Sequence, residues 1–307
     1  MGMLKKKIDI GIVILHYQNI EDTLQCVESI LNRLDTDSFI VAVVDNCSPN
    51  NSGSELCRKL KNYEKVIVHL NKKNLGFSGG NNVGIRIIKE QFDPNYIVLS
   101  NSDIELIDNS FYHKIETEYN KSNFAVLGPM IINPNGRNDS NPIFNIAYPR
   151  INAVYDLRYW KKRLFATKLG LEKLYCFCRA HNPLVEKHKR KIYINRKENS
   201  QSPLIRQEGK VLHGCFMIFS REYFRYFEGL DVQTFLYAEE DILFIHLMEK
   251  KLKTVYNPDI HILHKEDGSI NKSFKTTRKK KIFTYKNYIK AIKSYLLLLK
   301  QLKINNV

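Results

Sequence analysis

Four short apolar runs near the start of the chain constrain its fold more than any other feature. They are IDIGIVIL (8–15), FIVAVV (39–44), KVIVHL (65–70) and NYIVLS (95–100). Continuous apolar runs rich in β-branched residues are typical of strands that are covered on both faces. Their starts lie roughly 30 residues apart, which is the length of a β-α-β unit. The sequence therefore predicts a mainly parallel sheet with helices on both faces.

Helical spacing between the first two runs supports this arrangement. Ile20, Leu24, Val27 and Leu31 recur at the spacing of one helix side, and Asn19 precedes them as a candidate N-cap. We expect a helix there that packs its apolar side against the sheet.

Polar residues gather where the predicted strands end. The first strand runs into HYQN (16–19), the second into DNCSPNNSG (45–53), the third into NKKNLGFSGGNNVG (71–84) and the fourth into NSD (101–103). Any one of these loops could be ordinary turn chemistry. Because the carboxyl ends of parallel strands meet at one edge of a sheet, four such loops together predict a ligand crevice.

The glycine-rich stretch NLGFSGGNNVG (74–84) matches neither the G-x-G-x-x-G dinucleotide pattern nor a phosphate-binding P-loop, since no Gly-Lys-Ser/Thr closes it. What remains is a loop that allows close backbone approach before a helix N-terminus, which is a weak indication alone.

Asp103 follows an apolar strand and is suited to hold a divalent cation. A carboxylate and a diphosphate together supply the oxygen ligands that Mg²⁺ or Mn²⁺ prefers. The competing interpretation is an Asx-type turn that caps the next segment. Of the two histidines in NPDIHILH (257–264), His264 precedes a polar loop and is the better candidate for a further metal ligand or phosphate contact.

Three consecutive carboxylates stand in LYAEEDILF (236–244), on the first turn of a helix predicted from about Glu239 to Lys251. A strand is predicted upstream at VLHGCFMIF (211–219). Acidic residues on the first turn of a helix complement its dipole, so a structural role is a strong alternative. The functional interpretation is a general base, because crowding and apolar neighbours raise the pKa of a carboxyl group.

The positive charge of the chain is concentrated in two segments. The whole sequence holds 48 Lys and Arg against 32 Asp and Glu, a net charge of +16 that calls for an anionic partner. Residues 150–210 hold 16 basic and 5 acidic residues, and residues 268–307 hold 11 basic and none acidic. A charge run is usually only a solvated face, so that interpretation stays open.

The N-terminal stretch imitates a signal peptide, but Asp9 interrupts its apolar part and no small-residue cleavage site follows. No apolar run approaches the ~20 residues of a spanning helix. We expect a cytoplasmic protein, soluble or peripheral on a membrane.

Taken in chain order, six motifs resemble the bacterial family 2 glycosyltransferases of the GT-A fold, most closely the rhamnosyltransferase-like branch that builds capsular and O-antigen polysaccharides. The motifs are VVDNCSPNNS (43–52), NLGFSGGNNVGI (74–85), VLSNSDIEL (98–106), HGCFMIFSREYFRYFEGLD (213–231), FLYAEEDILF (235–244) and YNPDIHILH (256–264). The resemblance implies an α/β fold: a Rossmann-like, mixed, mainly parallel sheet flanked by helices, with a basic helical insertion and a basic C-terminal helix.

The resemblance also divides the chain. Residues 1–132 would form the nucleotide-sugar-binding half of the GT-A domain. Residues 133–268 would form the acceptor-binding and catalytic half, including the basic insertion at about 150–210. Residues 269–307 would form a basic amphipathic helical tail, because apolar residues recur there at helical spacing.

The same resemblance assigns site residues. Asp45 would bind the pyrimidine base of the donor, with the HYQN loop as the other wall of its pocket, while Asp103 and His264 would hold Mg²⁺ or Mn²⁺ on the diphosphate. The nucleotide-binding residues it implies are His16, Tyr17, Asn19, Asp45, Asn46, Gly76, Phe77, Asn81 and Ser102.

The base falls on Glu240 when LYAEEDILF is aligned without a gap with the Tyr-x-Glu-Asp pattern of the family. The family more often has Asp at that position, so Asp241 and Glu239 remain alternatives. The usual Asp-x-Asp metal motif is reduced here to Asn-Ser-Asp, which leaves one carboxylate fewer.

The resemblance implies an inverting hexosyltransferase that uses dTDP-rhamnose or a UDP-sugar. Its acceptor would be a hydroxyl of a lipid-linked glycan at the inner face of the cytoplasmic membrane. The two basic segments fit a protein that rests on an anionic bilayer, where each nearby Lys or Arg contributes about 1 kcal/mol.

Three other functions compete. A nucleotidyltransferase needs a glycine-rich loop with a basic residue after the first strand, and HYQNIEDT has neither. A nucleic-acid-binding protein would explain the charge, but the basic segments lie away from the strand ends and the acidic triplet would repel phosphates. We therefore expect no nucleic-acid partner. A non-catalytic, glycosyltransferase-like scaffold or binding protein at the membrane is the remaining alternative.

Overall fold

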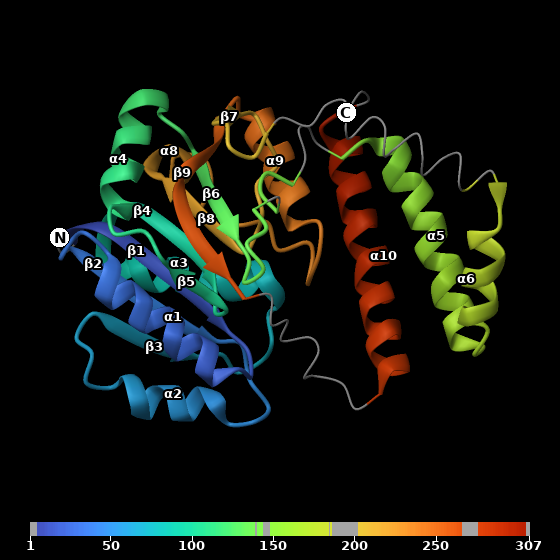
Figure 1. Cartoon of the computed structure of the whole chain (residues 1–307), viewed down its shortest axis with the longest axis horizontal. Helices are drawn as coiled ribbons and strands as arrows, with labels where there is room; N and C mark the ends of the chain where they lie inside the picture. Colours follow the sequence, from blue (N-terminus) through green and yellow to red (C-terminus); the bar gives the residue numbers. More distant parts are fainter. Residues whose placement is uncertain are drawn as a thin grey trace.

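A mixed sheet forms the centre of the computed structural model, which describes residues 5–138, 140–143, 148–183, 185, 202–265 and 276–304 (Figure 1). The strands are β1 (Lys6–His16), β2 (Phe39–Asp45), β3 (Val66–Leu70), β4 (Phe92–Asn101), β5 (Ile104–Leu106), β6 (Val126–Ile132), β7 (Gln207–Glu208), β8 (Phe216–Ser220) and β9 (Thr254–His264). The helices are α1 (Ile20–Arg33), α2 (Ser52–Leu60), α3 (Gly76–Gln91), α4 (Phe111–Ser122), α5 (Arg150–Lys168), α6 (Glu172–Ala180), α8 (Arg221–Phe224), α9 (Glu239–Glu249) and α10 (Thr277–Gln301).

The sheet order is β3-β2-β1-β4-β8-β6-β9-β5, with β7 paired to β9. Strands β1 to β4 are parallel to one another, as predicted from the spacing of their apolar runs. Strand β8 pairs antiparallel with both β4 and β6, so the sheet is mixed in its second half. The α/β fold with a mixed, mainly parallel sheet is therefore confirmed.

Both faces of the sheet are buried, which explains why its strands are continuously apolar. Alternate side chains of β1 enter two separate core clusters: Ile12 packs with Val27 of α1, and Val13 packs with Ile88 of α3. Helix α9 covers the second face with Leu243. Burial of each such side chain contributes about 1.5–3 kcal/mol, so the two clusters hold the strand ends in place.

Helices α5, α6 and α10 form a layer beside this core, which we call the helical appendage (Figure 1). Its aromatic-rich helices were expected within the basic insertion, and α10 within the tail. The apolar side of α10 is buried: Tyr295, Leu298 and Leu299 pack in one cluster with Ile245 of α9 and Ala153 of α5. Across the described part of the chain, no helix has the length and apolarity that crossing a bilayer requires.

Two local predictions were wrong in detail. The predicted strand 211–219 is regular only from Phe216, because the preceding residues turn to bring His213 and Gly214 to the sheet edge. Asn19 does occupy the N-cap position of α1, but its side chain makes no capping bond. It donates instead to the carboxylate of Asp22 one turn later.

Candidate active site

The ends of β1 and β2 bring the first two polar loops into contact. The register places His16 beside Asp45, and the backbone N–H of Asn46 donates to the His16 carbonyl over 3.0 Å. Further on, the Gln18 N–H donates to Ser48 Oγ at 2.8 Å. The two loops therefore form facing walls, as expected from their places at the strand ends.

His16 is fully buried between these walls and has a partner on each ring nitrogen. Nδ1 lies 2.6 Å from Thr23 Oγ1, and Nε2 lies 2.8 Å from Ser52 Oγ. Burial lowers the pKa of His16 to about 4, against the opposing effect of Asp45, whose Oδ1 is 3.9 Å from Nε2. His16 is thus neutral near pH 7, and Thr23 and Ser52 fix its ring beside Asp45.

Asp45 ends β2 at the N-terminus of α2. Its two carboxylate oxygens accept from the Ser48 N–H, each at 3.2 Å, and the side chain is buried. A carboxylate accepts hydrogen bonds only, so at this place it suits the N–H donors of a nucleobase edge.

Asn46 is fully engaged in holding the glycine-rich loop. Its Oδ1 accepts from the Leu75 N–H at 2.9 Å, and its Nδ2 donates to the Gly76 carbonyl at 2.9 Å. Gly76 has φ +74°, and a Cβ there would lie 2.3 Å from the Phe235 carbonyl oxygen, so only glycine fits. The next residue, Phe77, donates its N–H to the same carbonyl at 2.9 Å.

The remaining residues predicted to bind nucleotide differ in burial and in their hydrogen bonds within the chain. Tyr17 is half-buried at the loop after β1, and Ser102 is buried just after β4. Asn81 is buried on α3, where its Nδ2 donates to the Phe77 carbonyl at 3.1 Å. Its Oδ1 is buried without a hydrogen-bond partner. Because such an acceptor is costly to leave unpaired, Asn81 is open to a ligand donor.

Asp103 and His264 meet across two strands. Strand β5 pairs with β9 so that Ile104 stands opposite His264, and the Asp103 Oδ2 lies 3.3 Å from His264 Nε2. Both side chains are half-buried. Among the residues described, no three His, Cys, Asp or Glu side chains gather into a metal-binding group. The pair supplies one oxygen and one nitrogen ligand, which fits a cation whose other ligands come from a diphosphate.

His213 also lies at this edge, and the sequence analysis missed it. Its ring centroid is 6.1 Å from that of His264, and its Nδ1 accepts from the Cys215 N–H at 3.1 Å. Burial and the neighbouring His264 lower the pKa of His213 to about 4. The sequence feature that could have identified His213 is a polar residue directly before the strand that follows the long insertion.

The three consecutive carboxylates point in three directions from the first turn of α9. Glu240 Oε1 accepts from the Gly214 N–H at 3.2 Å, so it faces the edge that carries His213. Asp241 accepts from the backbone N–H of Tyr148. Glu239 lines a cavity on the other side of the helix. Of the three, Glu240 is therefore the one that contacts the backbone beside His213.

Close packing fixes Glu240 in that direction. A Cβ on residue 214 would lie 2.8 Å from Glu240 Oε1, so the carboxylate rests against a glycine backbone. Burial raises the pKa of Glu240 above its ordinary value, although the Gly214 N–H opposes the shift. Burial raises the pKa of Asp241 to about 7, with Glu240 adding to it. Burial and the Glu240 charge raise the pKa of Glu239 well above the usual range.

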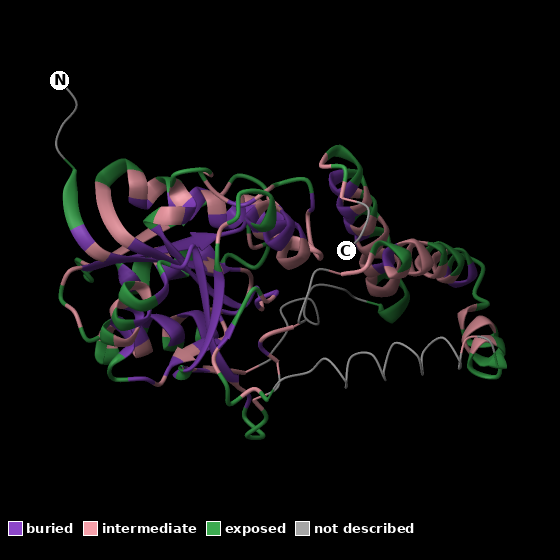
Figure 2. Ribbon diagram, turned by 90° about the horizontal axis from the view of Figure 1, so that it is seen from above, coloured by how far each residue is buried: buried purple, intermediate pink, exposed green. Residues whose placement is uncertain are grey.

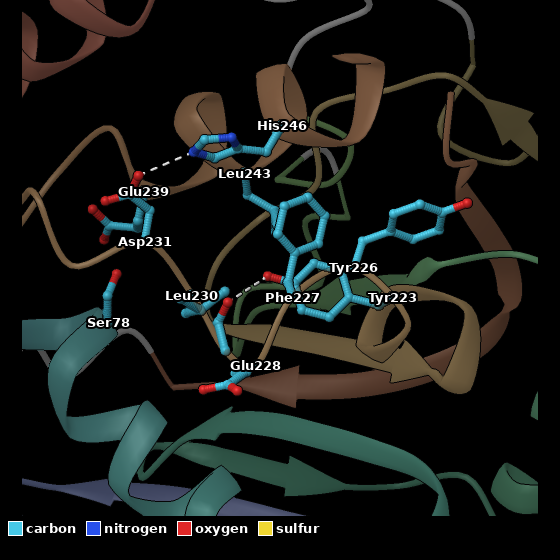
Figure 3. Close-up of a pocket in the computed structure, with 11 residues that line it drawn as sticks. Ser78, Tyr223, Tyr226, Phe227, Glu228, Leu230, Asp231, Glu239, Leu243 and His246 are labelled. Atoms are coloured by element: carbon cyan, nitrogen blue, oxygen red, sulfur yellow. Dashed lines mark hydrogen bonds and ion pairs between the residues drawn. The ribbon is translucent and has the colours of Figure 1, made fainter. Parts of the chain in front are cut away.

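The cavity beside Glu239 has a volume of about 300 Å³ and lies between α3, α9 and the loop before α9 (Figure 3). Ser78 and Asp231 line it with Glu239, and Tyr226 and Phe227 supply aromatic surface. His246 Nε2 lies 3.0 Å from the Asp231 carboxylate. Glu239 therefore faces this cavity, whereas Glu240 contacts the Gly214 backbone.

An aromatic stack links the turn before α9 to the helical appendage. Tyr237 and Ala238 both adopt left-handed backbone conformations, with φ 75° and 61°. The Tyr237 ring stacks on Tyr288 of α10 at 4.0 Å, and Tyr288 stacks on Trp160 of α5 at 4.6 Å. This stack fixes the strained turn from which the acidic triplet projects.

The structure thus brings together His16, Asp45, Asp103, His264 and Glu240 at one sheet edge, as expected. Asn19 and Asn46 also lie at this edge, but their side chains form hydrogen bonds within the chain. Such an edge offers hydrogen-bond acceptors for a base, ligands for a cation and a buried carboxylate of raised pKa that can accept a proton.

Comparison with known proteins places this arrangement in a family. A family model described as "Glycosyl transferase family 2" matches residues 11–227. The low-salt glycan biosynthesis hexosyltransferase Agl10 of Haloferax volcanii is 29% identical over 128 residues, which are 42% of this chain and 38% of that protein. The chain therefore spans well under half of that relative.

A likeness in fold extends further. The solved structure titled "Crystal structure of S. aureus TarS 1-349" superposes with a TM-score of 0.50 at 12% identity, over 91% of this chain and 70% of that one. At this identity the likeness concerns the fold alone.

Proposed function

Because the chain belongs to glycosyl transferase family 2, we propose that it is an inverting hexosyltransferase that moves a sugar from a nucleotide diphosphate to a glycan hydroxyl. The observation that carries the proposal is the position of Glu240. It stands at the same sheet edge as the Asp103–His264 pair, joined to it through Gly214 and His213.

The donor nucleotide would lie across the ends of β1 and β2. Asp45 accepts hydrogen bonds from a pyrimidine base, and the Ser48 N–H orients that carboxylate. Tyr17 lines the facing wall, and the unpaired Oδ1 of Asn81 accepts from a ribose hydroxyl. A dTDP-sugar or UDP-sugar fits this acceptor-rich crevice, with dTDP-rhamnose favoured by the motif resemblance.

Glu240 is the proposed base. Its raised pKa makes it a stronger proton acceptor than a surface glutamate, and the Gly214 N–H orients it. The carboxylate takes the proton from the acceptor hydroxyl while that oxygen forms a bond to the sugar C1 and the bond from C1 to the diphosphate breaks. Attack from the face opposite the leaving group inverts the anomeric centre.

Asp103 and His264 are the proposed ligands of Mg²⁺ or Mn²⁺, since a carboxylate oxygen and an imidazole nitrogen both suit such ions. When bound, the cation supplies charge neutralisation for the departing diphosphate. The β5–β9 pairing keeps the two side chains 3.3 Å apart, so the chain presents them together.

The acceptor would be a growing lipid-linked glycan for a cell-surface polysaccharide such as a capsule or O-antigen, handled at the inner face of the cytoplasmic membrane. The word "hexosyltransferase" in the name of the Haloferax relative supports sugar transfer in glycan biosynthesis. The net charge of +16 supports a position at an anionic bilayer.

Calorimetric titration of UDP, dTDP and GDP, each with and without Mn²⁺, tests the donor site in wild type and in Asp103→Ala. We expect cation-dependent binding of one pyrimidine nucleotide that is lost in the variant. Absence of binding for all three would overturn the donor site. Binding without any release of nucleotide from the matching nucleotide sugars would favour the scaffold alternative.

A further inference from the structure

The turn between α5 and α6 carries exposed apolar side chains that the catalytic site does not use. Phe165 is 66% exposed, Leu174 59% and Phe177 62%. Leu169 and Leu171, in the turn itself, are also more than half exposed. We call these five residues the turn surface. A cluster of this kind on a protein surface usually marks an interaction site.

Lysines surround the turn surface. Lys161, Lys162, Lys168 and Lys173 are all exposed, and Figure 2 shows the exposed residues along the projecting end of the appendage. Residues 150–183 contain eight basic and two acidic residues. The positive charge is therefore in excess directly beside the apolar side chains.

Neither acidic residue of this segment neutralises those lysines. The Asp156 carboxylate accepts from Tyr148 Oη at 2.6 Å. Glu172 is half-buried and accepts from Arg163, Lys281 and Tyr285 at 2.6–3.0 Å. The rim of the turn surface is thus a set of solvent-exposed cations.

The basic C-terminal helix α10 exposes a single large apolar side chain, Leu297, which is 49% exposed. Tyr295, Leu298 and Leu299 of α10 are buried between α9 and α5, so the apolar residues that made the tail amphipathic in sequence are used inside the protein. Among the described residues of the appendage, exposed apolar side chains therefore cluster beside basic ones at the α5–α6 turn, whereas Ile151 of α5 and Leu297 of α10 are isolated exposed apolar side chains.

We propose that the turn surface inserts into the interfacial region of an anionic lipid bilayer while the four lysines contact lipid headgroups. A helix pair with apolar and lysine-rich surface has the chemistry of a membrane-surface anchor. A second copy of this chain is a poorer partner, because the same lysines would meet across the contact. This inference deepens the proposed function and rests on its membrane location.

Docking at this turn would also position the catalytic helix. Helix α5 packs on α10, and α10 packs on α9, which carries Glu240. The aromatic stack of Trp160, Tyr288 and Tyr237 follows the same route. The membrane anchor and the proposed base are therefore connected through packed elements, which suits an acceptor whose lipid stays in the bilayer.

Vesicle co-sedimentation of the full chain tests the proposal without donor, acceptor or activity. Phosphatidylglycerol-rich vesicles should bind at least about tenfold more protein than pure phosphatidylcholine vesicles. The triple variant Phe165→Ser/Leu174→Ser/Phe177→Ser should lose at least about tenfold in affinity for the anionic vesicles, because its apolar contact is gone. Replacing Lys161, Lys162 and Lys168 by Ala should cost about fivefold per residue and only on anionic vesicles.

Tyr63→Ser is the matched control, since Tyr63 is 48% exposed but lies near α2, outside the appendage. It should bind vesicles as wild type does. Equal binding of wild type and the triple serine variant would overturn the proposal. A second result would also overturn the proposal: a wild-type dimer that does not bind vesicles and that becomes monomeric in the triple variant. The turn surface would then be an interface between two copies of the chain. Unchanged Mn²⁺-dependent nucleotide binding in every variant separates these results from a failure of the proposed function.

Discussion

The strand-end crevice and the helical appendage are held in place by different physical means. In the crevice, the position of each side chain follows from strand register: His16 stands beside Asp45 and Ile104 stands opposite His264 because the strands pair that way. In the appendage, position follows from packing. Rings of Trp160 and Tyr288 meet although more than a hundred residues separate them.

The proposed base lies where these two regions meet. Glu240 receives a hydrogen bond from Gly214 at the sheet edge, but the turn that presents it is stacked against the appendage through Tyr237. The comparison shows that the proposed binding groups are positioned by the sheet, whereas the proposed base contacts both regions. Changes in the sheet should therefore affect donor binding, and changes in the appendage should affect turnover.

The largest effect is expected where both regions contribute. Glu240→Gln keeps an acceptor for the Gly214 N–H but cannot take a proton, so turnover should fall about 10²–10⁴-fold with donor affinity unchanged. Asp241→Asn is the matched control, because Asp241 faces Tyr148 rather than the crevice. Release of nucleotide diphosphate from the donor measures both. Full activity in Glu240→Gln, or a comparable loss in Asp241→Asn, would move the base away from Glu240.

The second-largest effect is expected from a change in the sheet alone. His264→Ala removes one side chain of the pair 3.3 Å apart and should weaken cation-dependent nucleotide binding about 10–100-fold, since a charge-assisted contact is worth about 1.5–3 kcal/mol. Calorimetry with Mn²⁺ measures the loss. His261→Ala on the same strand is the control, because His261 is not part of the pair. Equal weakening in both variants would show that the strand, and not the ligand, had been damaged.

A smaller effect should come from the appendage. Tyr288→Leu removes the middle ring of the aromatic stack, whose contacts are worth about 0.5–1.5 kcal/mol each. We expect kcat to fall about threefold to tenfold while the Kd of the nucleotide stays constant. Tyr288→Phe keeps the ring and should restore turnover. If Tyr288→Leu weakens nucleotide binding as much as it slows turnover, the division between the two regions is wrong.

The last prediction concerns folding stability and not turnover or binding. Burial raises the pKa of Asp241 from 3.8 to about 7, so the folded chain binds more protons than the unfolded chain between about pH 4 and 7. Stability contributed by this group is present at low pH and is lost as pH rises through that window. Asp241→Asn should therefore gain stability over wild type as pH rises through that window, by on the order of 4 kcal/mol at pH 8, with little difference at pH 4. Denaturant unfolding at both pH values measures the difference, and a constant difference would contradict the assignment.

The sequence was most informative where short-range pattern and strand pairing decide structure. Apolar runs and their spacing predicted β1 to β4, and the polar loops predicted which edge holds the crevice. The Asp103–His264 contact was also expected, but from a family resemblance and not from the spacing of two residues so far apart.

What the sequence could not supply depends on packing between distant elements. Glu239, Glu240 and Asp241 are three adjacent carboxylates, and the sequence alone does not show which of them faces the sheet edge. The hydrogen bond from the Gly214 N–H distinguishes Glu240 in the structure. The apolar spacing of α10 correctly predicted a helix, yet the same spacing suits a membrane surface and a buried contact. His213 was missed because a lone histidine beside a strand is more often structural. The site assignments themselves stay predictions until the variants are measured.

The antiparallel pairing of β6 with β8 has a consequence for how such a chain can diversify. Residues 133–215 connect the neighbouring antiparallel strands β6 and β8, and β7 within this connection pairs with β9. Loop-closure entropy grows only slowly with length, so the part of this connection before β7 can change in size without loss of a strand. Since α5 within that loop packs on α10, an exchanged loop would need a matching α10. A change in the α5 part of this connection would therefore be accompanied by changes in α10, more than a hundred residues later in the sequence.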